Sequence, residues 1–454
     1  MNVRSSTLYF IGAISWLVIT GLGAMNLRTY LLNEGSIKFD EIYYFMLTLH
    51  GDSGMIAFVS FSSLAISIFL IEKYYSLNYK ILNSLFIIAN IGIIIYFLGG
   101  PIIGWYMLYP LSTQSFNFIG IYGKYFWISY LGIFIYCISI ETCSVYLWKK
   151  SNNLIFITLS LMIFSIPFLG ATMILYILSI VKGISVSPII TSFTFWEYGS
   201  PDTYFLTFSV FALLYYIFKP FSTKWTLWSK YPLMILPFLI FANHLQTWPI
   251  NPIVREASDF FTIILTGFLA ILFFNLIIPL FKTTINSTIE FLGVITLGGF
   301  LISSIFSIIL PFNFFDPIFH NTYYVVGSFH SIIWNFLITG FFLGFYIFTT
   351  NLEEKKELKN ENVILKTSLI TWLISSTILS YLMMYSGYEG LIRREVIFPS
   401  KFLPSMDLMT AFAFIAVTAI SLAFSIELSK LISVKIKKIE YKKFQAKIMN
   451  KIRH

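Results

Sequence analysis

Apolar runs of roughly 20 residues recur along the whole chain, and they constrain its fold more than any other feature. A run of that length matches the span of one bilayer helix. Hydrophobic residues make up 57% of the 454 residues and charged residues only 11%, whereas a soluble protein usually carries about 25% charged residues. The sequence therefore predicts an all-α polytopic membrane protein surrounded by the lipid bilayer.

The runs predict about twelve transmembrane helices and no separate soluble domain. We expect the transmembrane domain to occupy residues 1–434 and a basic tail to occupy residues 435–454. The approximate bounds of the spans are 8–27, 42–71, 82–105, 125–148, 154–181, 192–218, 231–247, 259–281, 289–311, 320–349, 364–388 and 405–434.

The loops alternate in positive charge, which predicts the orientation of the chain. One set of loops holds Lys73, Lys80, Lys149, Lys150, Lys219, Lys224, Lys230, Lys282, Lys355, Lys356 and Lys359. The other set holds fewer, namely Arg28, Lys38, Lys124, Lys182, Arg255, Arg393, Arg394 and Lys401. The positive-inside rule places the first set in the cytoplasm, and an even number of spans then places both termini there. The net charge of +9 reflects this topology and does not point to nucleic acid.

Four of the five histidines lie in or at the mouth of apolar runs: His50, His244, His320 and His330. An ionisable residue inside a membrane is costly unless it is paired or ligated, so it marks a functional site. In the predicted topology, His50 and His330 each lie about 12–15 Å below the outer edge of the bilayer. His244 falls near the outer end of the seventh span, and an arginine pair, residues 393–394, follows the eleventh.

Two histidines at matching depth on different helices can ligate one metal from opposite faces. In a membrane bundle the natural candidate is heme, whose iron accepts axial imidazoles. Arg393 and Arg394 at the outer rim would then neutralise the heme propionates. The alternative at this point is that these residues are polar groups lining the cavity of a transporter.

The motifs resemble the catalytic subunit I of the heme-copper oxidases, especially the divergent B-type branch, over nearly the whole chain. The segment 44–51, which ends in His50-Gly51, is similar to the second helix of the family, and the segment 320–330 to the tenth. The resemblance implies that His50 and His330 are the axial ligands of a low-spin heme. It also implies that Arg393 and Arg394 hold the propionates of that heme.

The resemblance extends to the second, high-spin heme of the family, but with departures. Asp316 and His320 match the pair near the propionates of that heme. Three of the four histidines of the dinuclear oxygen-reducing centre are replaced, and their positions are occupied by Ser328, Ser200 and Asn243. The fourth corresponds to His244, which we expect to hydrogen-bond Asn243, Ser200 or water. Tyr204 stands where the family has a cross-linked tyrosine, but the partner of that cross-link is absent.

These departures imply a respiratory-chain subunit that binds one low-spin heme, of type b or a, for electron transfer. The dinuclear centre is expected to be lost, so catalysis by this chain alone is not expected. Copper is not expected, because it prefers several imidazole ligands, whereas a second heme held at Asp316 and His320 remains open. The implied partners are other oxidase subunits, of the subunit II type or another redox protein. The implied location is the plasma membrane of a prokaryote.

Two other functions remain as alternatives. A functional terminal oxidase or nitric oxide reductase with an altered active site requires an open iron, which only a second heme would supply. A multi-span transporter is disfavoured, because two matching halves are not visible in the sequence.

Acidic residues in or near the spans are interpreted as mainly structural. They are Asp52, Glu141, Glu197 and Asp202. Of these, Glu197 and Asp202 are expected to reach water near the outer end of the sixth span. The partner of Asp52 does not follow from the sequence.

Overall fold

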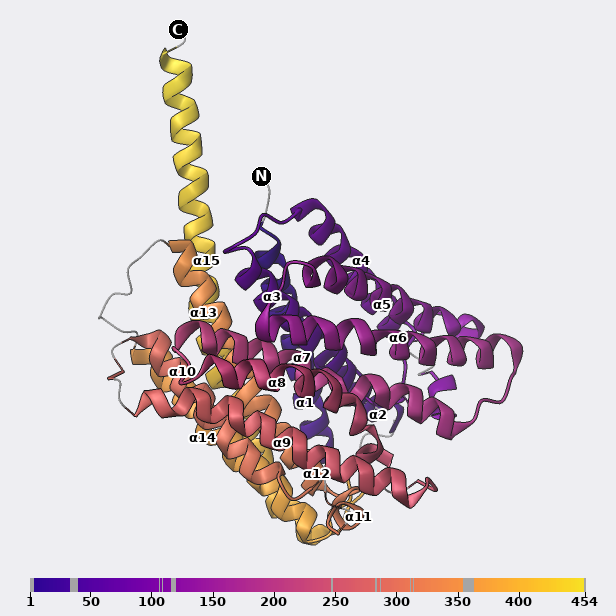
Figure 1. The fold of residues 1–454 in the computed structure, drawn as a ribbon. Helices are drawn as coiled ribbons and strands as arrows, with labels where there is room; N and C mark the ends of the chain where they lie inside the picture. The colour runs from indigo at the N-terminus through magenta and orange to yellow at the C-terminus, as the bar shows by residue number, and fades with distance from the viewer. Residues whose placement is uncertain are drawn as a thin grey trace.

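The computed structural model is a bundle of long helices joined by loops and short helical turns (Figure 1). It describes residues 4–32, 40–105, 107, 109–115, 120–245, 248–281, 284–285, 287–310, 312, 314–353 and 363–452. The side chains of the predicted tail, residues 435–454, lie outside the described part of the chain. Within the described residues the secondary structure is helical apart from two isolated bridges.

The bundle is built from long helices and the shorter turns that join or extend them. The α-helices of the first half are α1 (Ser5–Leu32), α2 (Asp40–Asp52), α3 (Val59–Ile71), α4 (Tyr79–Leu98), α5 (Trp127–Trp148), α6 (Asn153–Lys182) and α7 (Pro188–Ile217). Those of the second half are α8 (Thr223–Leu239), α9 (Pro252–Leu280), α10 (Thr288–Ser307), α11 (Asp316–Phe319), α12 (Tyr323–Ser331), α13 (Thr339–Glu353), α14 (Val363–Tyr388) and α15 (Leu403–Ile452).

Two π-helical segments and several 3-10 turns complete the chain. The π-helices are η1 (Ser53–Phe58), which joins α2 to α3, and η5 (Ile332–Ile338), which joins α12 to α13. The 3-10 turns are η2 (Leu111–Thr113), η3 (Gly123–Tyr125), η4 (Phe241–Leu245) and η6 (Ser400–Phe402).

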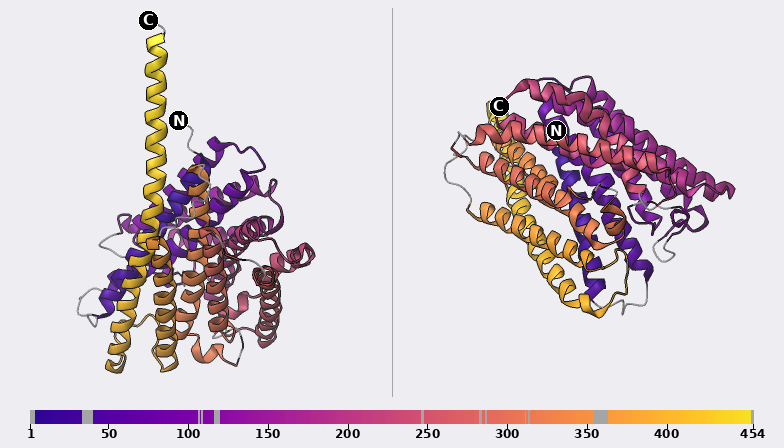
Figure 2. Two further views of the ribbon diagram at one scale, coloured as in Figure 1. Left: turned by 90° about the vertical axis from the view of Figure 1, so that its left-hand side faces the viewer. Right: turned by 60° about the horizontal axis from the view of Figure 1, so that its bottom comes forward.

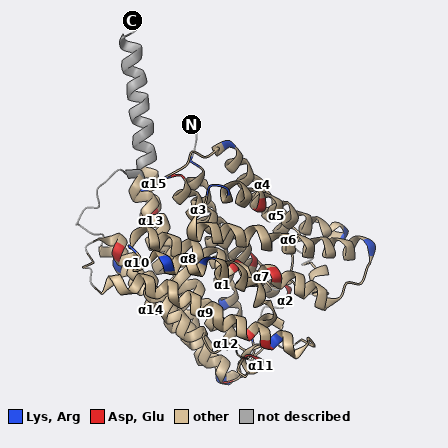
Figure 3. Ribbon diagram, viewed as in Figure 1, with Lys and Arg blue, Asp and Glu red and all other residues tan. Residues whose placement is uncertain are grey.

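The prediction of a helical membrane bundle is confirmed. Among the described residues, eleven helical stretches are long and apolar enough to cross a membrane. The sixth predicted span, 192–218, is not among these eleven; it is the 30-residue helix α7, which has the length but carries more polar residues. Charged residues occupy few parts of the described chain, as the mostly tan ribbon of Figure 3 shows. The helices of the second half run roughly parallel, side by side (Figure 2).

Local signals in the sequence set where several helices begin and end. Asn78 caps α4 by accepting hydrogen bonds from the backbone N–H groups of Lys80 and Ile81. Ser287 and Glu290 form a reciprocal capping box at the start of α10. Gly183 ends α6 in the left-handed conformation, with φ of 65°. These caps satisfy backbone groups that would otherwise lack partners at the helix ends.

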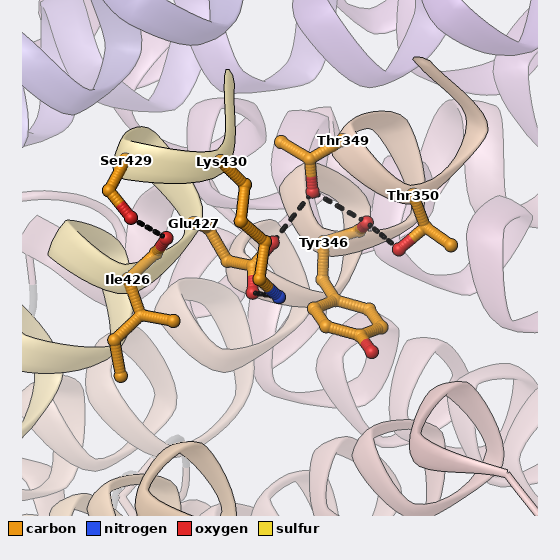
Figure 4. Close-up of polar contacts among 7 residues, drawn as sticks. All are labelled: Tyr346, Thr349, Thr350, Ile426, Glu427, Ser429 and Lys430. Atoms are coloured by element: carbon orange, nitrogen blue, oxygen red, sulfur yellow. Dashed lines mark hydrogen bonds and ion pairs between the residues drawn. The ribbon is translucent and has the colours of Figure 1, made fainter. Parts of the chain in front are cut away.

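A buried carboxylate on α15 takes part in an ion pair within that helix and in a hydrogen bond to α13 (Figure 4). The side chain of Glu427 is almost fully buried, and one of its carboxylate oxygens lies 2.5 Å from the Lys430 ammonium nitrogen. Its other oxygen accepts a hydrogen bond of 2.8 Å from the Thr349 hydroxyl on α13. A buried carboxylate is tolerated only where partners of this kind compensate for lost hydration.

Replacing Lys430 with alanine is expected to lower the free energy of unfolding by about 2 kcal/mol, because it leaves the Glu427 carboxylate buried without its cation. The cost is smaller than for a fully buried pair, since the lysine side chain is 33% exposed. Thermal unfolding of the detergent-purified chain measures the effect. The neighbouring variant Ser429→Ala is the control and should stay within about 0.5 kcal/mol of the parent. Equal stability of the two variants would contradict the prediction.

Candidate metal centre and the cavity around it

Two partly buried imidazoles from distant parts of the chain face each other. His50 near the end of α2 and His330 near the end of α12 have ring planes within 7° of parallel and ring centroids 5.8 Å apart. A metal atom between two imidazoles requires ring centres about 6 Å apart, because each metal–nitrogen bond is about 2 Å long. The structure therefore brings the two histidines into an arrangement that suits axial ligation of one metal.

Hydrogen bonds fix the tautomer of both rings. The Nδ1 atom of His50 lies 2.9 Å from the carbonyl oxygen of Thr20 on α1, and Nδ1 of His330 lies 2.7 Å from the carbonyl oxygen of Val326. A carbonyl oxygen only accepts, so each Nδ1 carries the proton and donates it. The Nε2 atom of each ring then keeps its lone pair for a metal, in the pattern common to histidine ligands.

A π-helical segment follows each histidine closely, and neither segment was predicted from the sequence. η1 begins three residues after His50, and η5 begins two residues after His330. Single π turns inside α-helices occur frequently at functional sites. In η5 the carbonyl of Trp334 accepts hydrogen bonds from the Trp372 indole at 3.3 Å and from the Thr339 hydroxyl at 3.2 Å. Side chains thus support the backbone where its regular pattern changes.

The outer rim of the site is held together by a short antiparallel contact. Thr322 pairs with Ile392 in an isolated bridge, and the backbone N–H of Arg393 donates to the Asn321 carbonyl at 3.0 Å. Thr322 also caps α12 by accepting from the N–H of Tyr324. The loop after α14 is therefore locked against the start of the helix that carries the second imidazole.

Four of the sequence-predicted rim residues line one cavity with the imidazole pair. Asp316 and His320 form a buried pair, with 3.0 Å between a carboxylate oxygen and Nδ1, and they line the cavity together with Arg393 and Arg394. Arg394 adopts φ of 67°, a conformation that a bulky residue rarely takes and that clusters at functional sites.

Arg28 belongs to this site, although the sequence placed it in a loop. It lies inside α1 because no glycine or proline ends the helix after residue 27, and α1 continues to Leu32. The side chain is 8% exposed, and its guanidinium nitrogen lies 3.5 Å from the sulfur of Met409 and 3.6 Å from that of Met406. Arg28 thus brings a buried positive charge to the wall of the cavity.

The residues at the predicted vestigial centre line the other half of the same cavity: Ser200, Tyr204, Asn243, His244 and Ser328. The Ser328 hydroxyl donates to the Ser307 hydroxyl at 3.0 Å. The Asn243 amide nitrogen donates to the Thr262 hydroxyl at 2.6 Å. Two oxygens of this group, Oγ of Ser200 and Oδ1 of Asn243, are buried and have no hydrogen-bond partner among the described residues.

His244 was predicted to hydrogen-bond Asn243, Ser200 or water, and of these the bonds to Asn243 and Ser200 are not formed. Instead the imidazole of His244 stacks on the indole of Trp196, with centroids 3.8 Å apart and planes within 8°. The reason is the position of Trp196 on α7, one turn before Ser200, where its large flat face covers the imidazole. The sequence did not single out this tryptophan.

The predicted water access of Asp202 is also wrong, because its side chain is fully buried near the middle of α7. The helix begins at Pro188, well before the predicted span, so the carboxyl group lies deep in the bundle. Asp52 has the partner that the sequence did not reveal: the Tyr96 hydroxyl donates to its carboxylate at 2.5 Å.

The cavity that joins these two halves has a volume of about 1070 Å³. Sites for small molecules usually have volumes of about 300–1,000 Å³, so this one has room for a large cofactor and more. Its walls come from α1, α2, α7, α9, α10, α12, α14 and α15. Fold and cavity together define a class of protein: a polytopic membrane bundle that holds two facing imidazoles between its helices.

Comparison with known proteins narrows this class to one family. The family described as "Cytochrome C and Quinol oxidase polypeptide I" matches residues 4–422. The quinol oxidase subunit 1 of Sulfolobus acidocaldarius is 30% identical over 428 residues, covering 87% of this chain and 83% of that protein. The cytochrome c oxidase polypeptide 1 of Halobacterium salinarum is 26% identical over 271 residues, covering 56% of this chain and 45% of that protein.

A solved structure agrees with these sequence matches. A heme-copper terminal oxidase dimer, determined by cryo-electron microscopy, superposes with a TM-score of 0.79 at 17% identity, covering 94% of this chain and 84% of that one. The chain therefore belongs to the heme-copper oxidase subunit I family, and the predicted resemblance is confirmed. Members of this family normally bind heme and work in complexes of several subunits.

Proposed function

We propose that this chain is a respiratory membrane subunit that holds one low-spin heme, of type b or a, between His50 and His330 for electron transfer. The observation that carries the proposal is the near-parallel pair of imidazoles, 5.8 Å apart, each with its Nδ1 proton committed to a backbone carbonyl. A heme with an imidazole on each side of its iron exchanges single electrons and has no open position for a gas molecule.

The surrounding residues fit such a cofactor. The carbonyls of Thr20 and Val326 orient the two rings and raise the basicity of the ligating nitrogens. Arg28, Arg393 and Arg394 bring three positive charges to the cavity wall, where they would offset anionic propionates. Apolar walls around them would suit the apolar faces of a porphyrin ring.

The other half of the cavity does not fit a copper ion and an axially ligated second heme. Imidazole nitrogen is the preferred copper ligand, yet Ser200 and Asn243 stand beside His244 there. The Ser328 hydroxyl, where a proximal histidine would be needed, donates to Ser307. No group of three or more His, Cys, Asp or Glu residues able to hold a metal occurs in the described part of the chain. We therefore propose that this chain alone does not reduce oxygen.

The proposed setting follows from topology and family. The lysine-rich loops and the basic tail, residues 435–454, would face the cytoplasm of a prokaryote, with residues 1–434 forming the domain in the plasma membrane. Because bis-imidazole heme only relays electrons, a second redox protein must supply or receive them. A subunit II-like protein or another oxidase subunit would serve as that partner.

Heme content and the dithionite-reduced optical spectrum, with and without carbon monoxide, test the proposal. The expected result is one heme per chain, with a six-coordinate spectrum that carbon monoxide leaves unchanged. Two hemes per chain, one of them shifted by carbon monoxide, would instead support an oxidase or a nitric oxide reductase with an altered centre. A chain purified without heme would overturn the proposal and favour a transport function.

A further inference from the structure

A chain of buried hydrogen bonds runs from α14 through η5 and α12 to α10, next to His330. The Ser376 hydroxyl on α14 donates to Oδ1 of Asn335 at 2.6 Å, and the amide nitrogen of Asn335 donates to the Ser331 hydroxyl at 3.2 Å. The Ser331 hydroxyl donates to the Ser303 hydroxyl on α10 at 3.2 Å. These four residues are at most 1% exposed. Buried polar groups need hydrogen-bond partners, and these groups find them in one another.

The chain has one direction, because the proton of its last hydroxyl is committed. Ser303 has a single hydroxyl proton, which the carbonyl oxygens of Gly299 at 2.7 Å and Ser331 at 2.8 Å share. The Ser303 oxygen therefore accepts from Ser331, whose own oxygen accepts from the Asn335 amide. Oδ1 of Asn335 accepts from Ser376. Removal of any one member would leave a buried neighbour without its partner, which is costly.

Asn335 lies at a close backbone approach between α10 and η5. A Cβ atom on Gly299 would lie 1.9 Å from the carbonyl oxygen of Asn335. Asn335 also carries the one amide side chain of η5. A buried amide costs free energy unless it is hydrogen-bonded, and this one bonds to Ser376 on α14 and, through Ser331, to α10. The side chain of Asn335 thus ties η5 to both of its neighbours.

The helix that carries His330 is short, so its rotation must be fixed locally. α12 spans only nine residues and is followed directly by the π-helix η5. Because the wider turns of η5 change the direction of later side chains, the packing of α13 does not by itself fix the rotation of α12. The His330 ring donates to the carbonyl of Val326 in the same helix at 2.7 Å, so the imidazole turns together with α12. Ser331, at the end of α12, supplies the contact to α10 that fixes this rotation.

We propose that Asn335 is a positioning residue for His330. The inference rests on the proposed function, because the ring that Asn335 orients is one of the two proposed heme ligands. Asn335 is not among the residues that line the cavity, so it acts through Ser331 and does not touch the cofactor. Its amide holds Ser331 against α10, and Ser331 keeps the adjacent histidine where the two imidazole planes lie within 7° of parallel.

Electron paramagnetic resonance of the oxidised, heme-loaded full chain in detergent tests the proposal. The g values of a low-spin ferric heme report the angle between its two axial imidazole planes. Asn335→Ala should shift these g values. It should also weaken heme binding about tenfold, the lower end of the range for residues that orient a metal ligand. Heme transfer to apomyoglobin measures the binding. Ser376→Ala, which removes only the donor to Oδ1 of Asn335, should give a smaller shift in the same direction.

Asn335→Asp is the conservative variant. In its neutral form the carboxyl group accepts from Ser376 with one oxygen and donates to Ser331 with the other. Burial favours that neutral form. This variant should therefore restore the g values and the heme affinity of the parent chain.

Two controls separate positioning from a general loss of stability. Ser380 is also a fully buried serine of α14, but its hydroxyl donates within its own helix, to the Ser376 carbonyl at 2.8 Å. Lys430→Ala lowers stability elsewhere in the bundle by removing the cation of an ion pair on α15. Ser380→Ala and Lys430→Ala should both keep the g values of the parent. Equal shifts in Asn335→Ala and Lys430→Ala would overturn the proposal, because the effect would then follow stability and not the polar chain.

The same spectra separate this proposal from the proposed function. A parent chain with a bis-imidazole heme whose g values do not change in Asn335→Ala overturns the positioning role alone. Where Asn335→Ala does not fold, unchanged g values in Ser376→Ala overturn it. A parent chain without a bis-imidazole heme overturns the proposed function, and the positioning role with it.

Discussion

Replacing His330 with alanine is expected to abolish the six-coordinate heme spectrum of the purified chain. Loss of a residue that only orients a metal ligand typically weakens metal binding 10–100-fold. Loss of the ligand itself should weaken heme binding by at least about 100-fold. We expect heme content to fall below about a tenth of the parent value, measured by the pyridine hemochrome assay. Any heme that remains should bind carbon monoxide, because one axial position is open.

His244→Ala is the matched control for this experiment. His244 is another partly buried histidine of the same cavity, but it stacks on Trp196. This variant should keep one heme per chain and an unchanged spectrum. If His330→Ala retained the six-coordinate spectrum while His244→Ala lost it, the ligand assignment would be wrong.

Replacing Gly299 with alanine is expected to destabilise the bundle by about 3 kcal/mol or more, at the upper end of the cost of overpacking. A Cβ atom on Gly299 would lie 1.9 Å from the carbonyl oxygen of Asn335 and 2.6 Å from its carbon. Both are backbone atoms of η5, so no side chain can move aside, and α10 must separate from η5. Because η5 begins two residues after His330, heme binding should weaken together with stability.

Gly298, the residue before Gly299, supplies the matched control. A Cβ atom on Gly298 would meet no atom within 4 Å, so Gly298→Ala should leave stability unchanged or raise it by up to about 1 kcal/mol. Thermal unfolding in detergent, together with heme content, compares the two variants. Similar unfolding temperatures for both would show that α10 and η5 do not pack as closely as described.

Much of the fold could be predicted because membrane spans leave a strong signal. Twenty apolar residues in a row have few alternatives in a bilayer, so the spans were located despite uncertain ends. The predicted ends of the spans were wrong where no residue in the sequence signals the start or the end of a helix. Thus α1 runs on past residue 27 and takes Arg28 into the cavity, and α7 begins at Pro188 and takes Asp202 away from water.

The candidate site was predictable only in part. The predicted equal depth of His50 and His330 in the membrane, on two different helices, suggested that they ligate the same metal. The structure places the centroids of their rings 5.8 Å apart. The support around them was not predictable. The partner of His50 is the backbone carbonyl of Thr20, a group that every residue carries, so no residue type marks it. The stacking of Trp196 on His244 depends on how α7 and η4 approach each other, which periodicity does not determine.

The π-helical segments η1 and η5 allow each histidine-bearing helix to direct its histidine and its later side chains toward different neighbours. In a uniform α-helix every residue turns the chain by about 100°, so the direction of an early side chain dictates the direction of every later one. One wider turn breaks that dependence. His50 and His330 can point at each other while α3 and α13, further along, present the faces that their own neighbours require. The wider turns thus change the direction in which later side chains point around the helix axis. The orientation of each histidine is therefore independent of how the rest of its helix packs.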